Sequence, residues 1–374
     1  NRYQSYINTI SRLGNPDLTW EKRKEITAGI DVLLLRKRLS LEVNYFNTKR
    51  EGIITNMSSV LPKLYGMDGI GTYENYNDIR YRGWEAALYW SDRIGKVEYT
   101  VGGSISTLKG KYLRYSENVV YDYQRVTGSA TGSYRGYVCL GKFTSQEEID
   151  ALNAKAQANG HDYYHQRLTG IGDLKYVDLN NDGTIDDEDC TFIGNPWPKV
   201  QYGFNISLEW RGIDFSADFT GIAGNDVMNL SRSYTESVQQ SSNTTADVFG
   251  ASYFLGNGLT SRPRIVTPDP ANGNAPVKDP NYNYQRYSDY FVEDGSYLKL
   301  KNITLGYTFP KRWTRKAKID RIRIYVSASN LLTFTDFSGL DPEFSTTTKT
   351  AYGIYYGSTY PQTKMISFGL DMNF

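Results

Sequence analysis

The clearest chemical pattern in this sequence lies in the acidic and amide side chains of the segment 178–189. Oxygen-bearing side chains stand at its first, third and fifth positions, Gly183 at the sixth, Ile185 at the eighth and Asp189 at the twelfth. A calcium loop has this spacing, because six to eight oxygens must converge at about 2.5 Å and glycine permits the sharp turn. The predicted ligands are Asp178, Asn180, Asp182, Thr184 through its carbonyl, Asp186 directly or through water, and Asp189.

The alternative for this segment is a polar turn without a metal. The flanking segments have extended patterns, so we do not expect the helix–loop–helix arrangement of an EF-hand. We predict a structural Ca²⁺ that holds a long loop in place.

Other residues offer little for catalysis. His161 and His165 would share a metal only on a helix, but no helix pattern covers them and no third ligand is evident. Cys139 and Cys190 form either a disulfide, which an exported loop would favour, or two free thiols. No nucleophile–base constellation and no phosphate-binding glycine pattern occur, so we predict that the protein is not an enzyme.

The composition excludes some classes of protein. Lys and Arg number 42 and Asp and Glu 41, a balance that argues against nucleic-acid binding. Mean hydropathy is −0.54, and the longest aliphatic run is only Val32 to Leu35, too short for a transmembrane helix. Neither observation excludes a membrane β-barrel, whose strands are apolar on one face only. The 32 tyrosines suit sites where a ring meets an apolar medium and its hydroxyl meets water.

Strict alternation of apolar and polar residues predicts strands that pair as hairpins. Isoleucine, alanine, valine and leucine fill every second position from Ile26 to Leu34, and the pattern resumes from Leu39 to Tyr45. Three further hairpins and a ninth, terminal strand follow, at 81–91 with 96–112, 199–210 with 213–222, 296–309 with 319–333, and 363–374.

The connections between these strands alternate in length. Those within hairpins are short, and those between hairpins are long: 55–80, 113–198, 223–295 and 334–362. Short turns at one end and long loops at the other are typical of an outer-membrane β-barrel, with the long loops outside. Aromatic residues at the strand ends fit the girdle of such a barrel: Tyr81, Trp84, Trp90, Tyr202, Trp210, Tyr307, Phe309 and Trp313.

The organisation of the chain follows from this barrel. A soluble β-sandwich also alternates, but it gives no reason for one-sided long loops. Single-chain bacterial barrels have even strand numbers, so nine strands predict a C-terminal portion of a larger barrel. We expect residues 1–374 to be all-β, transmembrane and antiparallel. We expect 113–198 to be an extracellular loop with the calcium motif and a short helix over 149–158, capped from Thr144 and Ser145. The segment 223–295 should be a second extracellular loop, and its part 223–288, rich in Ser, Asn, Gly and Pro, should be mobile.

Several ordered motifs resemble the SusC/RagA-type TonB-dependent outer-membrane transporters. They are "NPDLTWEKRKEITAGIDV", "RYRGWEAALYW", "GDLKYVDLNNDGTIDDEDCTFIGNPWPKVQYGFNISLEWRGIDFSADFTG", "YFVEDGSYLKLKNITLGYTFP", "IRIYVSASNLLTF" and "YPQTKMISFGLDMNF". The resemblance implies a plugged barrel of about 22 strands, whose plug, TonB-contacting segment and roughly 13 other strands would lie N-terminal to this sequence. Cys190 stands where the family often has a basic residue.

The resemblance also implies a function. The complete protein would import oligosaccharides or peptides across the outer membrane of a Gram-negative bacterium, driven by TonB, beneath a SusD-like lipoprotein lid. Outer-membrane lipid would surround its strands. A passive porin is the main alternative, and a barrel enzyme or an adhesin is a further one. The sequence names neither the substrate nor the oligomeric state.

Overall fold

The computed structural model describes residues 13–58, 71–237, 243–246, 248, 262–344 and 352–374. The chain divides into two compact units, Asn1–Thr131 with Lys199–Arg211, and Gly132–Pro198 with Gly212–Phe374. In the described part of the chain, no helix is both long and apolar enough to cross a membrane.

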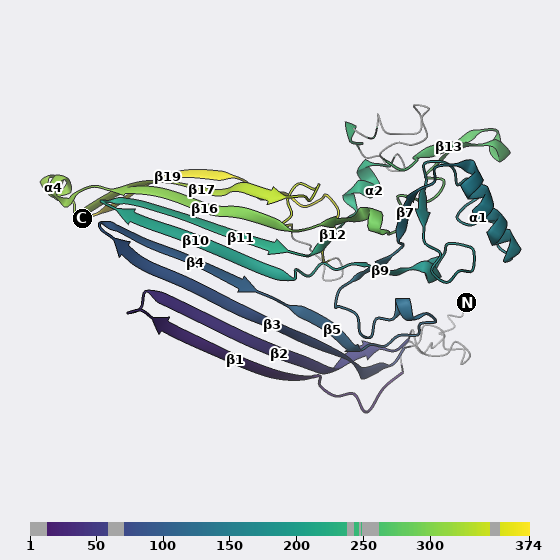
Figure 1. Ribbon diagram of the computed structural model, residues 1–374, viewed down its shortest axis with the longest axis horizontal. Coiled ribbons are helices and arrows are strands. Elements are labelled where there is room, and N and C mark those ends of the chain that lie inside the picture. Colours follow the sequence, from purple (N-terminus) through teal and green to yellow (C-terminus); the bar gives the residue numbers. More distant parts are fainter. Residues whose placement is uncertain (1–12, 59–70, 238–242, 247, 249–261, 345–351) are drawn as a thin grey trace, which may run out of the picture. The chain divides into compact units, whose positions relative to one another are not determined.

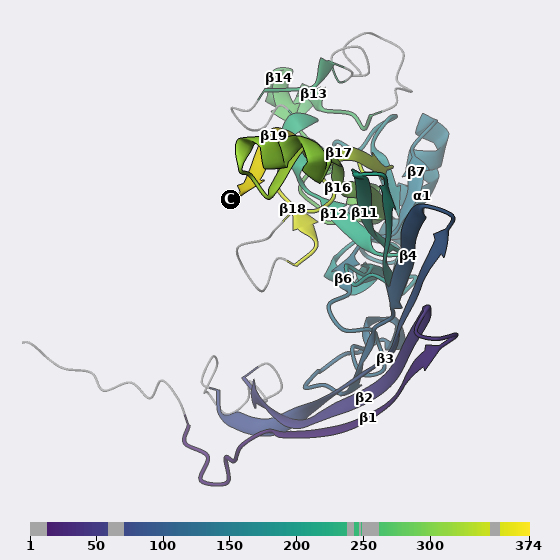
Figure 2. The same ribbon diagram turned by 90° about the vertical axis from the view of Figure 1, so that its left-hand side faces the viewer.

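The first unit is built on one antiparallel sheet, which curves along its strands (Figures 1 and 2). Its strands follow the order β1-β2-β3-β4-β10, and β5 pairs with β3. Their bounds are β1 Lys22–Leu34, β2 Leu39–Asn56, β3 Tyr73–Ile94, β4 Val97–Ser106, β5 Lys109–Arg114 and β10 Val200–Trp210, with the 3₁₀ helix η2 at Asp122–Gln124. The two predicted hairpins in this unit are confirmed.

One face of this sheet is apolar and uncovered. The apolar rows of β1, β2 and β3 align in register, as in Ile30 opposite Val43 and Val43 opposite Ala86. Ile26 remains 68% exposed, Ile30 65% and Leu88 50%. A contiguous apolar surface of this kind is stable only against another apolar phase, and the lipid around a barrel wall is such a phase.

Some predicted strand limits in this unit are wrong. The predicted loop 55–80 is shorter, because β2 continues to Asn56 and β3 starts at Tyr73. Main-chain pairing continues beyond the apolar rows, through charged pairs such as Lys49 opposite Arg80. The predicted strand 96–112 is broken between β4 and β5, where the Thr107 carbonyl occupies the space that a Cβ on Gly83 would need.

The long strands of the second unit form an antiparallel sheet in the order β11-β16-β17-β19 (Figure 1). Their bounds are β11 Ile213–Ala223, β16 Tyr297–Thr308, β17 Arg321–Thr335 and β19 Met365–Asn373, with α4 Lys311–Thr314 and η7 Arg315–Ala317 in the β16–β17 turn. With β1, β2, β3, β4 and β10, they confirm the nine predicted strands among the described residues.

A β-bulge in β16 accounts for a break in its alternation. Asn302 pairs with Asp218 and Leu300 with Phe219, so Lys301 has no opposite residue on β11. One extra residue reverses the faces of the positions that follow it. The apolar positions therefore shift phase from Leu300 to Ile303.

The predicted loop 113–198 is largely a folded substructure. Its elements are β6 Tyr134–Gly136, β7 Cys139–Lys142, α1 Gln146–Ala158, β8 Leu174–Tyr176, η3 Asp187–Asp189 and β9 Thr191–Gly194. The predicted helix is confirmed, and the Ser145 hydroxyl accepts a hydrogen bond from the Glu148 N–H at 3.2 Å. This substructure has its own apolar core.

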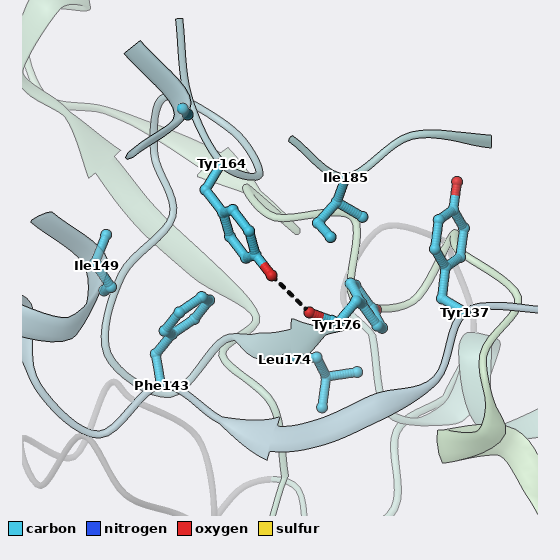
Figure 3. Close-up of a cluster of buried hydrophobic side chains, with 8 residues drawn as sticks. Tyr137, Phe143, Ile149, Tyr164, Leu174, Tyr176 and Ile185 are labelled. Atoms are coloured by element: carbon cyan, nitrogen blue, oxygen red, sulfur yellow. Dashed lines mark hydrogen bonds between the residues drawn. The ribbon is translucent and has the colours of Figure 1, made fainter. Parts of the chain in front are cut away.

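That core is rich in aromatic side chains (Figure 3). It contains Tyr137, Phe143, Ile149, Ala156, Tyr164, Leu174, Tyr176 and Ile185. The Tyr164 hydroxyl crosses it to donate a hydrogen bond to the Tyr176 carbonyl at 3.0 Å. Burial of these side chains therefore stabilises a folded structure in a segment that the alternation of apolar and polar residues did not assign to strands.

The remaining connections contain short elements too. They are β12 Asp226–Asn229, α2 Ser231–Thr235, β13 Val266–Asp269, η5 Pro270–Asn272, β14 Ala275–Lys278, η6 Asp289–Phe291, β15 Val292–Asp294 and β18 Ile354–Tyr355. A second apolar cluster, which includes Met228, Ile265 and Phe291, packs among them. The described parts of 223–295 are thus structured, whereas 238–242, 247 and 249–261 lie outside the described residues.

Candidate functional site

The candidate calcium loop follows β8 and ends in the 3₁₀ helix η3. Gly183 at its centre has a φ of +94°, and a Cβ there would lie 2.9 Å from the Asn159 side-chain nitrogen. Glycine is therefore required both by the backbone conformation and by the closeness of the C-terminal end of α1. The Asn159 side chain also donates to the Asp182 carbonyl at 2.7 Å, which joins the helix to the loop.

Three of the predicted ligands shape the turn through main-chain hydrogen bonds. The Asp178 carboxylate accepts from the Gly183 N–H at 3.0 Å. The Asn180 side-chain oxygen accepts from the Asp182 N–H at 3.0 Å, and the Asp182 carboxylate accepts from the Thr184 N–H at 2.9 Å. These bonds, from side-chain oxygens to main-chain N–H groups two to five residues further on, curl the loop into a tight polar turn.

The last two predicted ligands form a capping pair. Asp186 accepts from the Glu188 N–H at 2.7 Å, while the buried Asp189 carboxylate accepts from the Asp186 N–H at 3.0 Å and the Leu179 N–H at 2.7 Å. Burial raises the pKa of the Asp189 carboxyl, and the nearby negative charge of Asp178 adds to this effect against the main-chain hydrogen bonds. Asp189 thus ties the end of the loop to its start.

The observation most favourable to a cation is an unsatisfied oxygen. The Asp178 side chain is only 6% exposed, and its Oδ1 atom is buried without a hydrogen-bond partner. The Lys155 ammonium group lies 3.4 Å from its other oxygen, Oδ2. An uncompensated carboxylate oxygen in a buried position is costly unless a cation reaches it.

The carboxylates are not gathered around one point. Among the described residues, no group of three or more His, Cys, Asp and Glu side chains is placed to hold a metal ion. The Thr184 hydroxyl is turned away and donates to the Tyr163 carbonyl at 3.0 Å. The turn, the glycine and the unsatisfied Asp178 oxygen fit a calcium loop, but side-chain rotations would be needed for its oxygens to converge.

The histidines and cysteines have structural surroundings. His165 is buried between the rings of Phe143, Tyr164 and Tyr176, and burial, followed by the Arg286 charge, holds its pKa well below the usual range. The Arg286 guanidinium lies 3.2 Å from its Nδ1 atom.

Both cysteines are free thiols in this structure, so the disulfide alternative is not realised. Burial raises the pKa of Cys139 to about 12, with Asp289 as the next cause. A thiol of this kind is a poor nucleophile.

Comparison with known proteins identifies the fold family. Residues 1–187, half of the chain, match the family described as "TonB dependent receptor-like, beta-barrel". The chain belongs to this family. It is similar to TonB-dependent receptor P3 of Formosa agariphila, with 28% identity over 98% of this chain and 35% of that protein. It is also similar to TonB-dependent receptor SusC of Bacteroides thetaiotaomicron, with 23% identity over 99% of this chain and 33% of that protein.

A solved structure has the same fold. The RagAB peptide importer in its closed-closed state matches with a TM-score of 0.67 and 18% identity, over 96% of this chain and 36% of that chain. The resemblance to SusC/RagA-type transporters is thus confirmed. The chain spans about a third of the length of the curated relatives that it matches.

Sequence reasoning missed a buried polar network in this TonB-dependent receptor barrel. The fully buried Asp173 carboxylate accepts hydrogen bonds from Arg264 Nε at 3.1 Å and from Asn283 Nδ2 at 2.9 Å. Asn281 and Asn283 also bond the main chain of Leu174, at 3.0 and 2.9 Å. The network fastens the segment 262–295 to the calcium-loop substructure, and no local pattern around these residues predicts it.

A second missed cluster fixes the last long connection of the barrel. Lys299 of β16, only 1% exposed, lies 2.6 Å from the Asp341 carboxylate and 3.1 Å from Glu343. Lys301 also pairs with Glu343, at 2.6 Å. Burial opposes ionisation of Asp341, but the hydrogen bond from Lys299 and two main-chain N–H groups holds its pKa below the usual value. Alternating lysines in a strand could have suggested buried ion pairs, but not their partners.

Proposed function

We propose that the complete protein imports oligosaccharides or peptides across the outer membrane of a Gram-negative bacterium. The observation that carries this proposal is membership of the TonB-dependent receptor family, together with relatives named SusC and a peptide importer as structural neighbour. This chain would supply the C-terminal wall of the barrel and several of its external loops. It would not be an enzyme.

The proposal includes two protein partners. TonB would supply energy through a segment outside this sequence, and a SusD-like surface lipoprotein would cover the external loops. The folded connections of the second unit support this, because two apolar cores and buried polar networks give them a defined surface. A partner that docks repeatedly needs such a surface, since disordered loops would lose entropy at every closure.

The experiment is a deletion of the whole gene, followed by growth on single oligosaccharides and on defined peptides as nutrients. We expect slow growth on one of these classes and full recovery when the intact gene is restored. The captured full-length protein should bring a lipoprotein with it. Unchanged growth on every nutrient tested, with no lipoprotein captured, would contradict the proposal.

We also propose that the segment 178–189 binds one structural Ca²⁺. Asp178, Asn180, Asp182, the Thr184 carbonyl, Asp186 and Asp189 would hold it, and the ion would supply the positive charge that the buried Asp178 oxygen lacks. Its role would be to order the loop between β8 and β9. An external loop meets calcium concentrations at which even a weak site fills.

Calorimetry on chelator-treated full-length protein tests the calcium proposal. Wild type should bind Ca²⁺, and Asp182→Ala should bind much more weakly while the barrel still inserts. Asp162→Ala, which removes an exposed carboxylate outside the motif, is the matched control and should bind normally. No binding by wild type, or equal binding by all three proteins, would mean that the segment 178–189 is a polar turn that binds no metal.

A further inference from the structure

The apolar face of the first sheet ends in two rows that are rich in basic side chains. One row runs across β2, β3 and β5 as Asn47, Arg82 and Lys109, each opposite the next. The row beyond it is basic on four consecutive strands: Lys24, Lys49, Arg80 and Lys111. We name Lys24, Lys49, Arg80, Arg82, Lys109 and Lys111 the basic belt.

The belt lies on the face that carries the apolar rows. The β1–β2 register is unbroken from Lys22 to Leu34, so Lys24 shares its face with Ile26 and Ile30. On β3, Arg82 and Arg80 continue the row of Leu88 and Trp84. The ring of Trp84 packs against Tyr45 with centroids 4.7 Å apart, and this pair forms the row next to the belt. The order along the wall is therefore apolar, aromatic and then basic.

Much of the charge on the belt is not compensated. Lys24 and Lys49 share the single carboxylate of Glu51, each at 2.6 Å. Arg80, Arg82, Lys109 and Lys111 are exposed and make no ion pair within the described residues. Neighbouring strands are about 4.8 Å apart, so these positive charges are close enough to repel one another. A row of this kind is unfavourable in isolation and favourable when anions lie against it.

We propose that the basic belt binds the phosphate groups of anionic lipid headgroups in the outer leaflet of the membrane. The inference rests on the strands crossing that membrane with their long loops outside. Aromatic residues mark the edge of the hydrocarbon region in such walls. The first belt row is two residues beyond Trp84, or about 7 Å along the strand, which is headgroup depth.

The orientation favours lipid over a protein partner. The belt lies on the face of the sheet whose apolar residues would contact hydrocarbon, whereas the long connections leave from the ends of the strands. Arginine and lysine side chains are also the groups that proteins use for phosphate. An acidic protein surface would have to enter the membrane plane to reach them.

The test compares two triple variants of the full-length protein in detergent. The belt variant is R80Q/R82Q/K111Q. The control, R23Q/R50Q/R93Q, removes three charges from β1, β2 and β3 on the opposite face, where exposed ion pairs contribute little stability. Native mass spectrometry would count bound phosphorylated lipid A and its dephosphorylated form, each offered as the probe.

We expect wild type and the control to prefer the phosphorylated probe by at least tenfold, with a preference that falls as salt rises. Each basic side chain near an anionic lipid surface contributes about fivefold, so three removals should reduce binding by roughly a hundredfold. Circular dichroism checks that both variants fold. If the belt variant does not fold, a salt-independent preference of wild type would still overturn the proposal.

Three results with the variants would also overturn it. The belt variant could keep the wild-type preference, or both variants could lose it equally, which would indicate a general charge effect. The belt variant could also bind lipid normally but fail to capture the lipoprotein, which would make a protein the occupant. None of these results bears on whether the protein imports nutrients, so the two proposals fail separately.

Discussion

Neutralising Asp173 should loosen the joined external connections while leaving the barrel strands intact. Asp173 is fully buried and pairs with Arg264, which is 6% exposed. The substitution Asp173→Asn removes the negative charge that faces the buried Arg264 guanidinium. Its single side-chain oxygen can replace only one of the two carboxylate oxygens that accept from the Gly170 N–H and from Asn283.

The expected cost follows from the burial of both groups. Breaking a buried ion pair by removing one partner costs about 3–5 kcal/mol, mainly because the remaining charge stays desolvated. Because 1.4 kcal/mol is a factor of ten, about 3 kcal/mol raises the population of locally opened molecules by roughly a hundredfold. The double substitution D173N/R264M removes both charges of the pair and should be less damaging than either single one.

Hydrogen exchange on the full-length protein measures this opening directly. The Arg264 N–H, which donates to the Gly172 carbonyl at 3.0 Å, should exchange roughly a hundredfold faster in Asp173→Asn. Asp122→Asn is the control, because Asp122 is 91% exposed in its pair with Arg125 and such pairs contribute at most about 1 kcal/mol.

Two results would refute the reasoning. A change below threefold at Arg264 would mean that the pair does not hold the connections together. An equal rise in the long strands, such as β16 and β17, would mean that Asp173 stabilises the whole unit and not the connections.

Three further predictions concern insertion and pH. Leu41→Arg on the apolar face should cost about 2–4 kcal/mol in a membrane-folding assay, whereas Glu42→Arg on the other face should be tolerated; equal costs would contradict the assignment of faces. Deleting Phe374, which follows β19 and continues its alternation, should lower membrane insertion more than deleting Asn243, as measured by the folded fraction in outer-membrane extracts. Equal insertion would count against this. Burial raises the pKa of Asp279 to about 6, so the folded state binds its proton more tightly than the unfolded chain does. Local stability should therefore fall by up to about 3 kcal/mol as pH rises from 4 to above 6. The protection from hydrogen exchange in Asp279→Asn should lack this pH dependence.

The sequence was sufficient to predict the strands, because alternation reports which residues face an apolar medium. It misplaced several strand ends, since main-chain pairing extends beyond the apolar rows, as it does at Lys49 and Arg80. The bulge at Lys301 illustrates another limit, because its phase shift depends on pairing with two neighbouring strands.

The candidate site was predictable only in its local part. The spacing of Asp178, Gly183 and Asp189 indicates the turn, and the structure has that turn. The loop also depends on contacts from α1 and its C-cap, because Asn159 donates to the Asp182 carbonyl and the Lys155 ammonium lies 3.4 Å from Asp178 Oδ2. The Asp173–Arg264 network joins residues 91 positions apart, so no local pattern could reveal it.

Energised uptake by the complete protein is the most direct test of its proposed function. Cells that express it would be given the labelled oligosaccharide or peptide identified by the growth experiment, with and without a protonophore that collapses the inner-membrane gradient. Our account predicts that binding at the cell surface persists while accumulation stops when the gradient is lost. Accumulation that continues at the same rate without the gradient would contradict the account and identify a passive porin.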